Sequence, residues 1–390
     1  MEYDLGISEE PYATACQMYW QIDEHGFFVY KVSEIAKATG LTQPKINETV
    51  TQYTRAYSDE TFCLDCEQPY IYKNRTDYQN LLEGKNWRCG DCLEAIAFDE
   101  SKHKRHELQM RYDRLSEEGY MPAEMDIDSM AKLMALLKHS ASEDMTTIQP
   151  IGKNKDDPFS PNDEYTRSIL SELLSSNAIT FDPNSNMDRI IFEDDGSITY
   201  YPFEVNWLVP LGPDYATLGE FYLSLEKQLP ELLRLEGAER SVKELCMQEC
   251  LSYLEFILTE HRLPFKPGEK TRLVLEKGLQ HFTVSQMYAI IWSTGNSAAS
   301  YYMRGNIPKQ QAANSVVGRI DGYIDRALAE NWNVKSFGRR FDLPQSALSR
   351  LVFNNLLGTS DGGFNLPLSE LLEMAKSDLD KDEAEFLNKP

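Results

Sequence analysis

The sequence predicts a mainly α, multidomain α+β protein. Three observations carry this prediction: two CxxC cysteine pairs near the N-terminus, a β-rich stretch around residues 179–211, and apolar residues at helical spacing from residue 213 onward. The chain has 390 residues, of which 42% are hydrophobic and 26% charged, a composition typical of globular proteins. A chain of this length exceeds one ordinary domain, so we expect roughly two to four domains.

Residues 1–100 carry the strongest signal, the two CxxC pairs. Their members are Cys63, Cys66, Cys89 and Cys92. Each CxxC can form a tight turn that directs two sulfurs at one point, and the residues between the pairs are sufficient for a short hairpin, with Gly90 inside the second turn. Four thiolates so arranged predict one structural Zn²⁺ per chain in a zinc ribbon, with no ligand position left for water. Two disulfides or four free buried thiols are the alternatives.

A helix-turn-helix pattern precedes the cysteines, at residues 32–50. A short helix is followed by the turn residue Gly40 and by a second helix that begins near Pro44. We expect a shared core of Ile35, Leu41, Ile46 and Val50. Lys45 and Asn47 would then face outward on the second helix.

The same pattern recurs at a constant offset of 302 residues, which predicts a second helix-turn-helix at 334–357. Asp342 stands where the first copy has its turn glycine. The outward positions and the residues before them include Arg339, Arg340 and Arg350. Because any amphipathic helix pair can produce this spacing, two helices that only pack together are the alternative.

The rest of the chain divides by composition. Apolar residues on both sides of Asp194-Asp195-Gly196 predict a β-hairpin, and polar residues with three prolines predict a linker. The expected segments are a charged helical segment at 101–138, a linker at 139–165, a small α/β hairpin region at 166–212, a helical domain at 213–375 and an acidic tail at 376–390.

The charge distribution is uneven. The net charge is -23, which disfavours binding to nucleic acid, but residues 261–350 contain thirteen Lys or Arg against six Asp or Glu. The net charge of residues 261–350 is therefore +7, and that of the remaining residues is -30. A basic region inside an acidic protein is typical of a polyanion-binding surface, and a solvated helical face is the alternative explanation.

No apolar run approaches the ~20 residues of a membrane span, and seven cysteines with four assigned to zinc fit a reducing compartment, so we expect a cytoplasmic protein. The sequence has neither GxxxxGK[ST] nor GxSxG, and Glu204 in its apolar stretch is not followed by the lysine of a restriction-type nuclease. No catalytic residue and no small-molecule cofactor are therefore predicted.

Residues 32–50 together with the four cysteines resemble a helix-turn-helix or winged helix followed by a zinc ribbon, similar to the large subunit of general transcription factor E. The resemblance covers about a quarter of the chain. It implies binding to nucleic acid or to a nucleic-acid machine, and an acidic version of the module favours a protein partner.

We therefore expect a zinc-binding DNA-binding protein, a regulator or the recognition subunit of a larger nucleic-acid-directed system. The residues expected to contact phosphates or base edges are Lys45, Asn47, Arg339, Arg340 and Arg350. A protein–protein adaptor that uses acidic and helical surfaces is the second hypothesis. A nuclease or nucleotide-processing enzyme whose site assembles from separated residues is the third.

Overall fold

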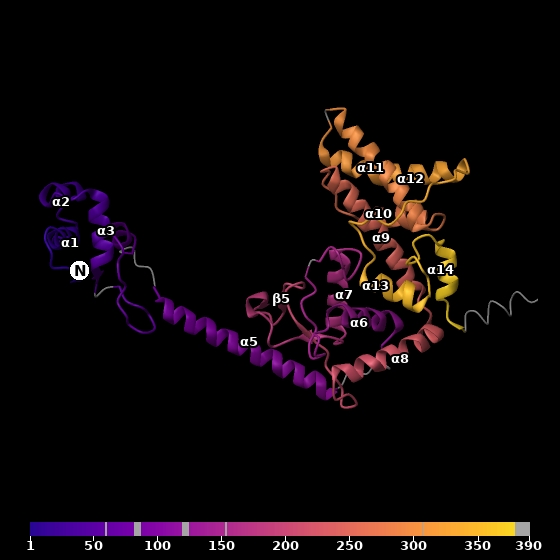
Figure 1. The fold of residues 1–390 in the computed structure, drawn as a ribbon, viewed down its shortest axis with the longest axis horizontal. Coiled ribbons are helices and arrows are strands. Elements are labelled where there is room, and N and C mark those ends of the chain that lie inside the picture. The colour runs from indigo at the N-terminus through magenta and orange to yellow at the C-terminus, as the bar shows by residue number, and fades with distance from the viewer. Residues whose placement is uncertain (59–60, 82–86, 119–124, 153, 306, 379–390) are drawn as a thin grey trace, which may run out of the picture. The chain divides into compact units, whose positions relative to one another are not determined.

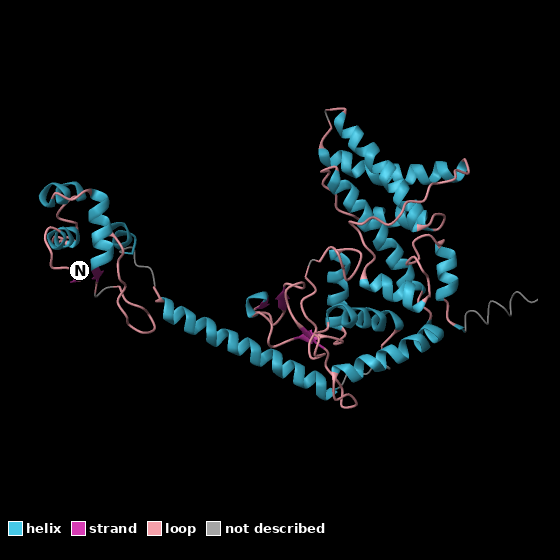
Figure 2. Ribbon diagram, viewed as in Figure 1, coloured by secondary structure: helices cyan, strands magenta, loops and turns pink. Residues whose placement is uncertain are grey.

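The protein is mainly helical, as the sequence predicts, and its strands are few and short (Figures 1 and 2). The computed structural model describes residues 1–58, 61–81, 87–118, 125–152, 154–305 and 307–378. The chain divides into two compact units, Met1–His103 (unit 1) and Lys104–Pro390 (unit 2). Helix α5 (Gly90–Glu118) contributes residues to both units. No helix of the described ranges is long and apolar enough to cross a membrane.

Unit 1 is a small helical bundle on a two-stranded sheet. Its elements are β1 (Glu2–Leu5), α1 (Tyr12–Trp20), α2 (Val32–Thr39), α3 (Gln43–Tyr53), β2 (Thr54–Tyr57), α4 (Arg75–Leu81) and the beginning of α5. Strand β1 pairs antiparallel with β2, and helix α1 packs against both α2 and α3. The chain therefore returns from α3 directly into the strand that pairs with its own N-terminus.

The core of unit 1 follows the expected pattern. Ile35 and Ile46 are fully buried, Val50 is 1% exposed, and Leu41 is half-buried against them. Trp20 at the end of α1 joins this core, and its Nε1 donates a hydrogen bond to Thr54 Oγ1 at 2.9 Å. The predicted shared core of α2 and α3 is therefore confirmed.

Arg75, the first residue of α4, connects separate parts of unit 1. Its Nε donates to the carbonyl of Tyr19 at 2.7 Å and its Nη1 to that of Tyr30 at 2.5 Å. The guanidinium also lies 4.4 Å from the ring centres of Tyr19 and Phe28. These contacts give hydrogen-bond partners to backbone carbonyls at the end of α1 and before α2.

Unit 2 contains the remaining helices and two small sheets. Its helices after α5 are α6 (Ile127–Ser140), α7 (Asp163–Ser175), α8 (Leu218–Glu236), α9 (Glu239–Glu260), α10 (Glu269–Leu279), α11 (Val284–Met303), α12 (Lys309–Ala329), α13 (Ala347–Ser349) and α14 (Leu368–Ala375), with a π-helical turn at Arg350–Leu356. Its strands are β3 (Thr180–Phe181), β4 (Ile190–Phe192), β5 (Ile198–Tyr200) and β6 (Trp207–Leu208). Strands β4 and β5 form the predicted hairpin, and β3 pairs antiparallel with β6.

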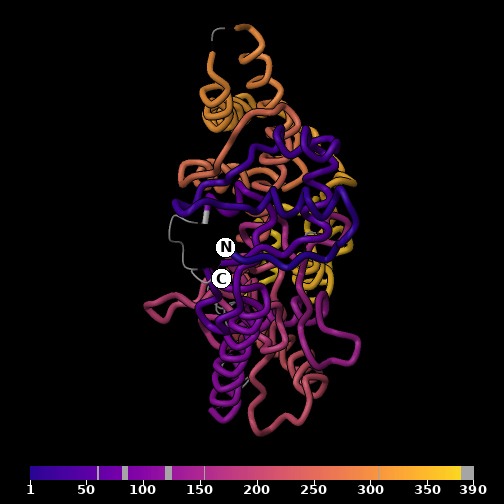
Figure 3. The backbone as a smooth tube through the Cα atoms, turned by 90° about the vertical axis from the view of Figure 1, so that its left-hand side faces the viewer, coloured from indigo at the N-terminus to yellow at the C-terminus, as the bar shows by residue number. Residues whose placement is uncertain are grey.

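Helix α9 lies at the centre of unit 2. Most of its residues between Ser241 and Leu258 are buried on every side, which is the pattern of a helix surrounded by others. It packs against α10, α11 and α14, while α6 packs against α8. Helices α11 and α12 lie side by side in the orange part of the chain (Figures 1 and 3).

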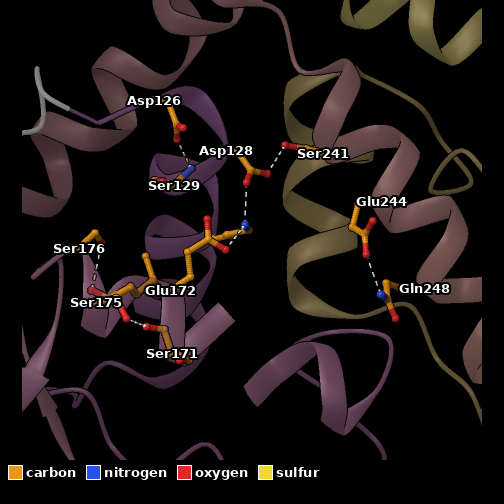
Figure 4. Close-up of polar contacts among 12 residues, drawn as sticks. Asp126, Asp128, Ser129, Ser171, Glu172, Ser175, Ser176, Ser241, Glu244 and Gln248 are labelled. Carbon is orange, nitrogen blue, oxygen red and sulfur yellow. Dashed lines mark hydrogen bonds and ion pairs between the residues drawn. The ribbon is translucent and has the colours of Figure 1, made fainter. Parts of the chain in front are cut away.

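A buried ion-pair cluster joins α6, α7 and α9 (Figure 4). Lys132, 5% exposed, donates from Nζ to Asp128 Oδ2 at 2.6 Å and to Glu172 Oε2 at 2.7 Å. The second oxygen of Asp128 accepts a hydrogen bond from Ser241 Oγ at 2.6 Å. Both oxygens of the buried Asp128 carboxylate are therefore satisfied, as burial of a charge requires.

Residues 139–165, expected as a linker, contribute to the core of unit 2. Ile148 is fully buried and pairs with Trp207 through backbone hydrogen bonds of 2.9 Å in both directions. Phe159 is 2% exposed, and its carbonyl accepts a hydrogen bond from the N–H of Leu348. Isolated apolar residues thus anchor this polar, proline-rich stretch, which does not separate two bodies.

The second helix-turn-helix, expected at 334–357, is not formed. Residues 333–346 are extended or turn-like, and only Ala347–Leu356 is helical. Val334 is 5% exposed, and the N–H of Phe337 donates to the carbonyl of Ser285 at 3.0 Å. The apolar residues whose spacing predicted the first helix of the pair instead anchor an extended segment beside the start of α11. The expected acidic tail at 376–390 lies almost wholly outside the described residues.

Candidate metal centre

Four cysteine sulfurs gather at one point in unit 1. The Sγ atoms of Cys63, Cys66, Cys89 and Cys92 all lie within 4.8 Å of one another. The Sγ atoms of Cys66 and Cys89 are 3.6 Å apart, far beyond a disulfide bond, and every cysteine of the chain is free. Metal–sulfur bonds of about 2.3 Å in a tetrahedral site place sulfurs about 3.8 Å apart. The cluster therefore has the size of a four-thiolate metal site.

The first cysteine pair, Cys63 and Cys66, lies in a tight turn that is closed by backbone hydrogen bonds. The N–H of Cys63 donates to the carbonyl of Gln68 at 2.8 Å, and the N–H of Glu67 donates back to the carbonyl of Cys63 at 3.0 Å. Phe62 and Pro69 form a β-bridge at the base of this turn. The chain thus reverses within six residues, which points the side chains of both cysteines the same way.

The second pair lies at the beginning of α5. Cys89 precedes the first residue of the helix, and Cys92 lies in its first turn. The N–H of Cys89 donates to Cys63 Sγ at 3.3 Å, and that of Cys92 to Cys89 Sγ at 3.4 Å. The free N–H groups of a helix N-terminus stabilise negative charge, so this position suits thiolate ligands.

The predicted hairpin between the pairs is wrong for the described residues. After the bridge between Ala56 and Tyr72 the chain enters α4, and Gly90 is helical instead of part of a second metal-binding turn. Two contacts hold the pairs together without a hairpin. The N–H of Leu64 donates to the carbonyl of Trp87 at 3.1 Å, and Arg88 Nε lies 2.7 Å from Asp65 Oδ2.

The thiols of the cluster differ in how readily they ionise. Burial raises the pKa of Cys63, but N–H groups from Cys89, Cys66 and Asp65 outweigh it and lower that pKa to about 6. The neighbouring sulfurs of Cys89 and Cys66 raise the pKa of Cys92 well above its ordinary value. Four thiolates repel one another, so full ionisation of the cluster requires a cation at its centre. Soft sulfur ligands in tetrahedral geometry suit Zn²⁺ or iron.

The helical position of Gly90 gives a direct test. A Cβ added there meets no atom within 4 Å, so Gly90→Ala is expected to keep the metal and to change the stability of unit 1 by less than about 1 kcal/mol. Gly40, which caps α2 with φ at 73°, provides the contrast: Gly40→Ala forces alanine into the left-handed region and costs about 1–2 kcal/mol. Chemical denaturation with metal analysis measures both. Loss of metal in Gly90→Ala would contradict the helical placement.

The two predicted nucleic-acid contacts in unit 1 are exposed on α3. Lys45 and Asn47 both face solvent, and Lys45 Nζ lies 3.1 Å from Glu48 Oε2. The glutamate raises the pKa of Lys45. The exposed Lys45–Glu48 pair is weak, so the side chain of Lys45, like that of Asn47, can turn toward a ligand.

The three predicted contacts in unit 2 are paired with acids. Arg350 Nη2 lies 2.6 Å from Asp157 Oδ1, and Arg340 Nη2 lies 2.8 Å from Asp342 Oδ2. Arg339 is 18% exposed in its side chain, and its Nη1 donates to a buried glutamate, Glu249, at 2.6 Å. The buried pair holds Arg339 within the protein, which weakens the case for a phosphate contact there, whereas the pairs of Arg340 and Arg350 are partly exposed and weak, like that of Lys45.

Two buried ion pairs among the described residues of unit 2, Lys132–Asp128 and Arg339–Glu249, were not predicted from the sequence. Asp128 and Lys132 stand four residues apart in an otherwise apolar helix, which was the available signal for a buried pair. Nothing comparable marks Glu249, because its partner Arg339 is 90 residues away.

Fold and site together define a mainly helical protein with a candidate four-cysteine metal centre in its smaller unit. No protein-family model, curated protein or solved structure matches the chain.

Proposed function

We propose that unit 1 is a zinc-stabilised helix-turn-helix module that engages DNA through α3. The observation that carries the proposal is the combination of the α2–α3 pair with the four-cysteine cluster in one small unit. In helix-turn-helix proteins the second helix lies in the major groove, where its exposed residues contact base edges. The metal would fix the chain between β2 and α5 and thereby hold the unit together.

The geometry of the α2–α3 pair supports this proposal. Helix α2 ends at Gly40, whose N–H donates to the carbonyl of Ala36, and α3 begins three residues later with Pro44 in its first turn. The turn is therefore short and fixed, as a helix-turn-helix requires. Asn47 can donate to and accept from a base edge, and Lys45 can contact phosphate.

Charge sets the expected strength of binding. Residues 1–103 contain nine Lys or Arg and eighteen Asp or Glu, a net charge of -9. Lys45 is the only Lys or Arg on α3. Because the salt dependence of binding reports the number of phosphates neutralised, we expect modest affinity and a shallow slope of log K against log salt, about -1 to -3.

Lys45→Ala combined with Asn47→Ala is expected to weaken binding to double-stranded DNA about tenfold or more and to make the salt slope shallower by about one. Fluorescence anisotropy with metal-loaded protein across a salt series measures both quantities. Asn80→Ala combined with Lys102→Ala removes the same groups from exposed positions on α4 and α5 and serves as the matched control. Equal losses in both variants, or no binding at low salt, would contradict the proposal.

A further inference from the structure

Helices α11 and α12 carry a surface without acidic residues. No Asp or Glu occurs from residue 277 to residue 320, a stretch of 44 residues with a net charge of +4. The whole chain has 62 acids among 390 residues, so about seven would be expected in a stretch of this length. We call residues 297–305 and 307–319, where the end of α11 lies beside the start of α12, the α11–α12 arm. The arm forms one extremity of unit 2 in both views (Figures 1 and 3).

Three cations of the arm have no acidic partner. Arg304 and Lys309 are exposed and Arg319 is half-buried, and no ion pair joins any of them to another residue that the structure describes. Asp321 and Asp325, the next acids along α12, are both held by a lysine of α10, at 2.6 and 2.5 Å. A negatively charged ligand on the arm would therefore meet unpaired cations and no carboxylate of the arm itself.

Two half-buried tyrosines at the end of α11 lie beside two of these cations. The guanidinium carbon of Arg319 is 5.1 Å from the ring centre of Tyr301, and Lys309 Nζ is 5.8 Å from that of Tyr302. Two serine hydroxyls accept hydrogen bonds from Arg319 Nε and Nη1, at 3.1 and 2.8 Å. These contacts fix the guanidinium, while its Nη2 has no hydrogen-bond partner among the described residues and can donate to a ligand.

Three of the cation–ring contacts elsewhere in unit 2 are also ion pairs. Arg189 lies 5.2 Å from the ring centre of Tyr201 and pairs with Glu204 at 2.9 Å. The arginines beside Phe256 and Phe364 pair with acids as well. The arm instead combines rings with cations that have no acid, and this combination is typical of surfaces that bind nucleic-acid strands. There the cations contact phosphates, while bases stack on rings or on guanidinium planes.

We propose that the α11–α12 arm binds a single strand of DNA. Arg304, Lys309 and Arg319 would contact its phosphates, and its bases would stack beside Tyr301 and Tyr302. Lys309 and Arg319 are ten residues apart on α12, about 15 Å, which spans about four nucleotides of a stacked strand. The choice of DNA over RNA rests on the proposed function of unit 1, but the site lies in unit 2 and does not involve α3.

A lipid surface fits the arm less well than a nucleic-acid strand. Met303 is 81% exposed at the end of α11, but the exposed Gln310 and Gln311 follow at the start of α12. One methionine contributes much less apolar area than an acyl chain, which by itself is only a marginal membrane anchor. The two glutamine amides can instead donate hydrogen bonds to phosphates or bases.

Binding of a fluorescein-labelled oligothymidylate of twelve nucleotides to the full, metal-loaded chain tests the proposal, by anisotropy across a salt series. Three phosphate contacts on a single strand predict a slope of log K against log salt of about -2. Arg304→Gln with Lys309→Gln and Arg319→Gln, the arm variant, should raise Kd at least tenfold and bring the slope toward zero. Tyr301→Leu with Tyr302→Leu keeps every charge and should raise Kd about tenfold with little change in slope.

Two controls separate the arm from net charge and from tyrosine content. Arg114→Gln with Arg262→Gln and Lys266→Gln removes the same charge at exposed positions of unit 2 outside the arm. Tyr201→Leu removes a ring whose arginine already pairs with an acid. Each control should change Kd less than twofold. Equal losses in the arm variant and the charge control would overturn the proposal, because attraction would then follow net charge alone.

Thermal melting checks that the variants fold. Arg304→Gln with Lys309→Gln, both at exposed positions, repeats the test without the half-buried Arg319 and should still raise Kd at least threefold. An unchanged Kd in a folded double variant would remove the phosphate contacts from the arm.

The remaining outcomes concern another ligand or another site. Lys45→Ala with Asn47→Ala should lose duplex binding and keep oligothymidylate binding, so the proposals for unit 1 and for the arm can fail separately. An oligothymidylate loss as large in that variant as in the arm variant would move the strand to unit 1. Arm-dependent binding to oligouridylate or to phosphatidylserine vesicles, with none to oligothymidylate, would assign the arm to RNA or to a membrane and overturn the choice of single-stranded DNA.

Discussion

Removal of the metal is expected to unfold unit 1 while unit 2 stays folded. Cys63→Ser, at a fully buried ligand position, should have the same effect as a chelator. Binding of structural zinc contributes an apparent 10–16 kcal/mol in small zinc domains, more than the entire stability of most small domains. The hydrophobic core formed by the described residues of unit 1 is small, so it cannot offset that loss.

Hydrogen exchange read by mass spectrometry resolves the two units within the full chain. We expect protection to be lost in α1, α2 and α3 and retained in α9 and α11. Cys246→Ala, which removes a buried thiol of unit 2, serves as the control and should keep both the metal and the protection of unit 1. Full protection of unit 1 from hydrogen exchange after chelation would show that this unit stays folded without a metal, and would contradict the prediction.

Replacement of Lys132 by alanine should lower the free energy of unfolding of unit 2 by about 3–5 kcal/mol. The substitution removes the cation that pairs with Asp128. Because Asp128 is only 8% exposed, its carboxylate is left as an uncompensated charge between α6 and α9. Glu172 contributes less, because its side chain is 41% exposed and water can replace the lysine.

Urea denaturation followed by circular dichroism measures the Lys132 effect. The matched control is Lys138→Ala on the same helix, where Nζ lies 3.5 Å from Glu226 Oε1 and both side chains are partly exposed. Its cost should stay below about 1 kcal/mol. Lys132→Met combined with Asp128→Asn should recover most of the lost stability, since no buried charge remains. Similar costs for Lys132→Ala and Lys138→Ala would contradict the buried-pair account.

The sequence was informative where the signal is local. The spacing of the CxxC pairs predicted which four sulfurs meet, and the apolar spacing of residues 32–50 predicted the shared core of α2 and α3. Both patterns depend on a few neighbouring residues whose geometry is fixed by the backbone. The hairpin at β4–β5 was predicted for the same reason.

The second cysteine pair shows how one motif serves two local structures. A CxxC can form a turn between strands or the first turn of a helix, and Gly90 fits either. Asp91, an acid in the first turn of α5, was the available signal for the helix, because it stabilises the helix dipole. The prediction of a helix beginning only at residue 101 overlooked it.

Predictions failed where distant contacts decide the structure. The repeat at 334–357 matched the apolar positions of a helix pair, yet Val334 and Phe337 hold an extended segment whose backbone pairs with the start of α11. A periodic pattern of apolar residues alone does not distinguish a helix from an extended segment with a few buried anchors.

Metal analysis of the purified full chain is the most direct test of the four-cysteine centre. Plasma mass spectrometry should find one zinc per chain, none in Cys63→Ser, and a retained zinc in Cys246→Ala. Cobalt substitution should then give the visible spectrum of tetrahedral four-thiolate coordination. A chain that contains no metal, or a metal that remains in Cys63→Ser, would contradict the account, and iron in place of zinc would keep the site but change its chemistry.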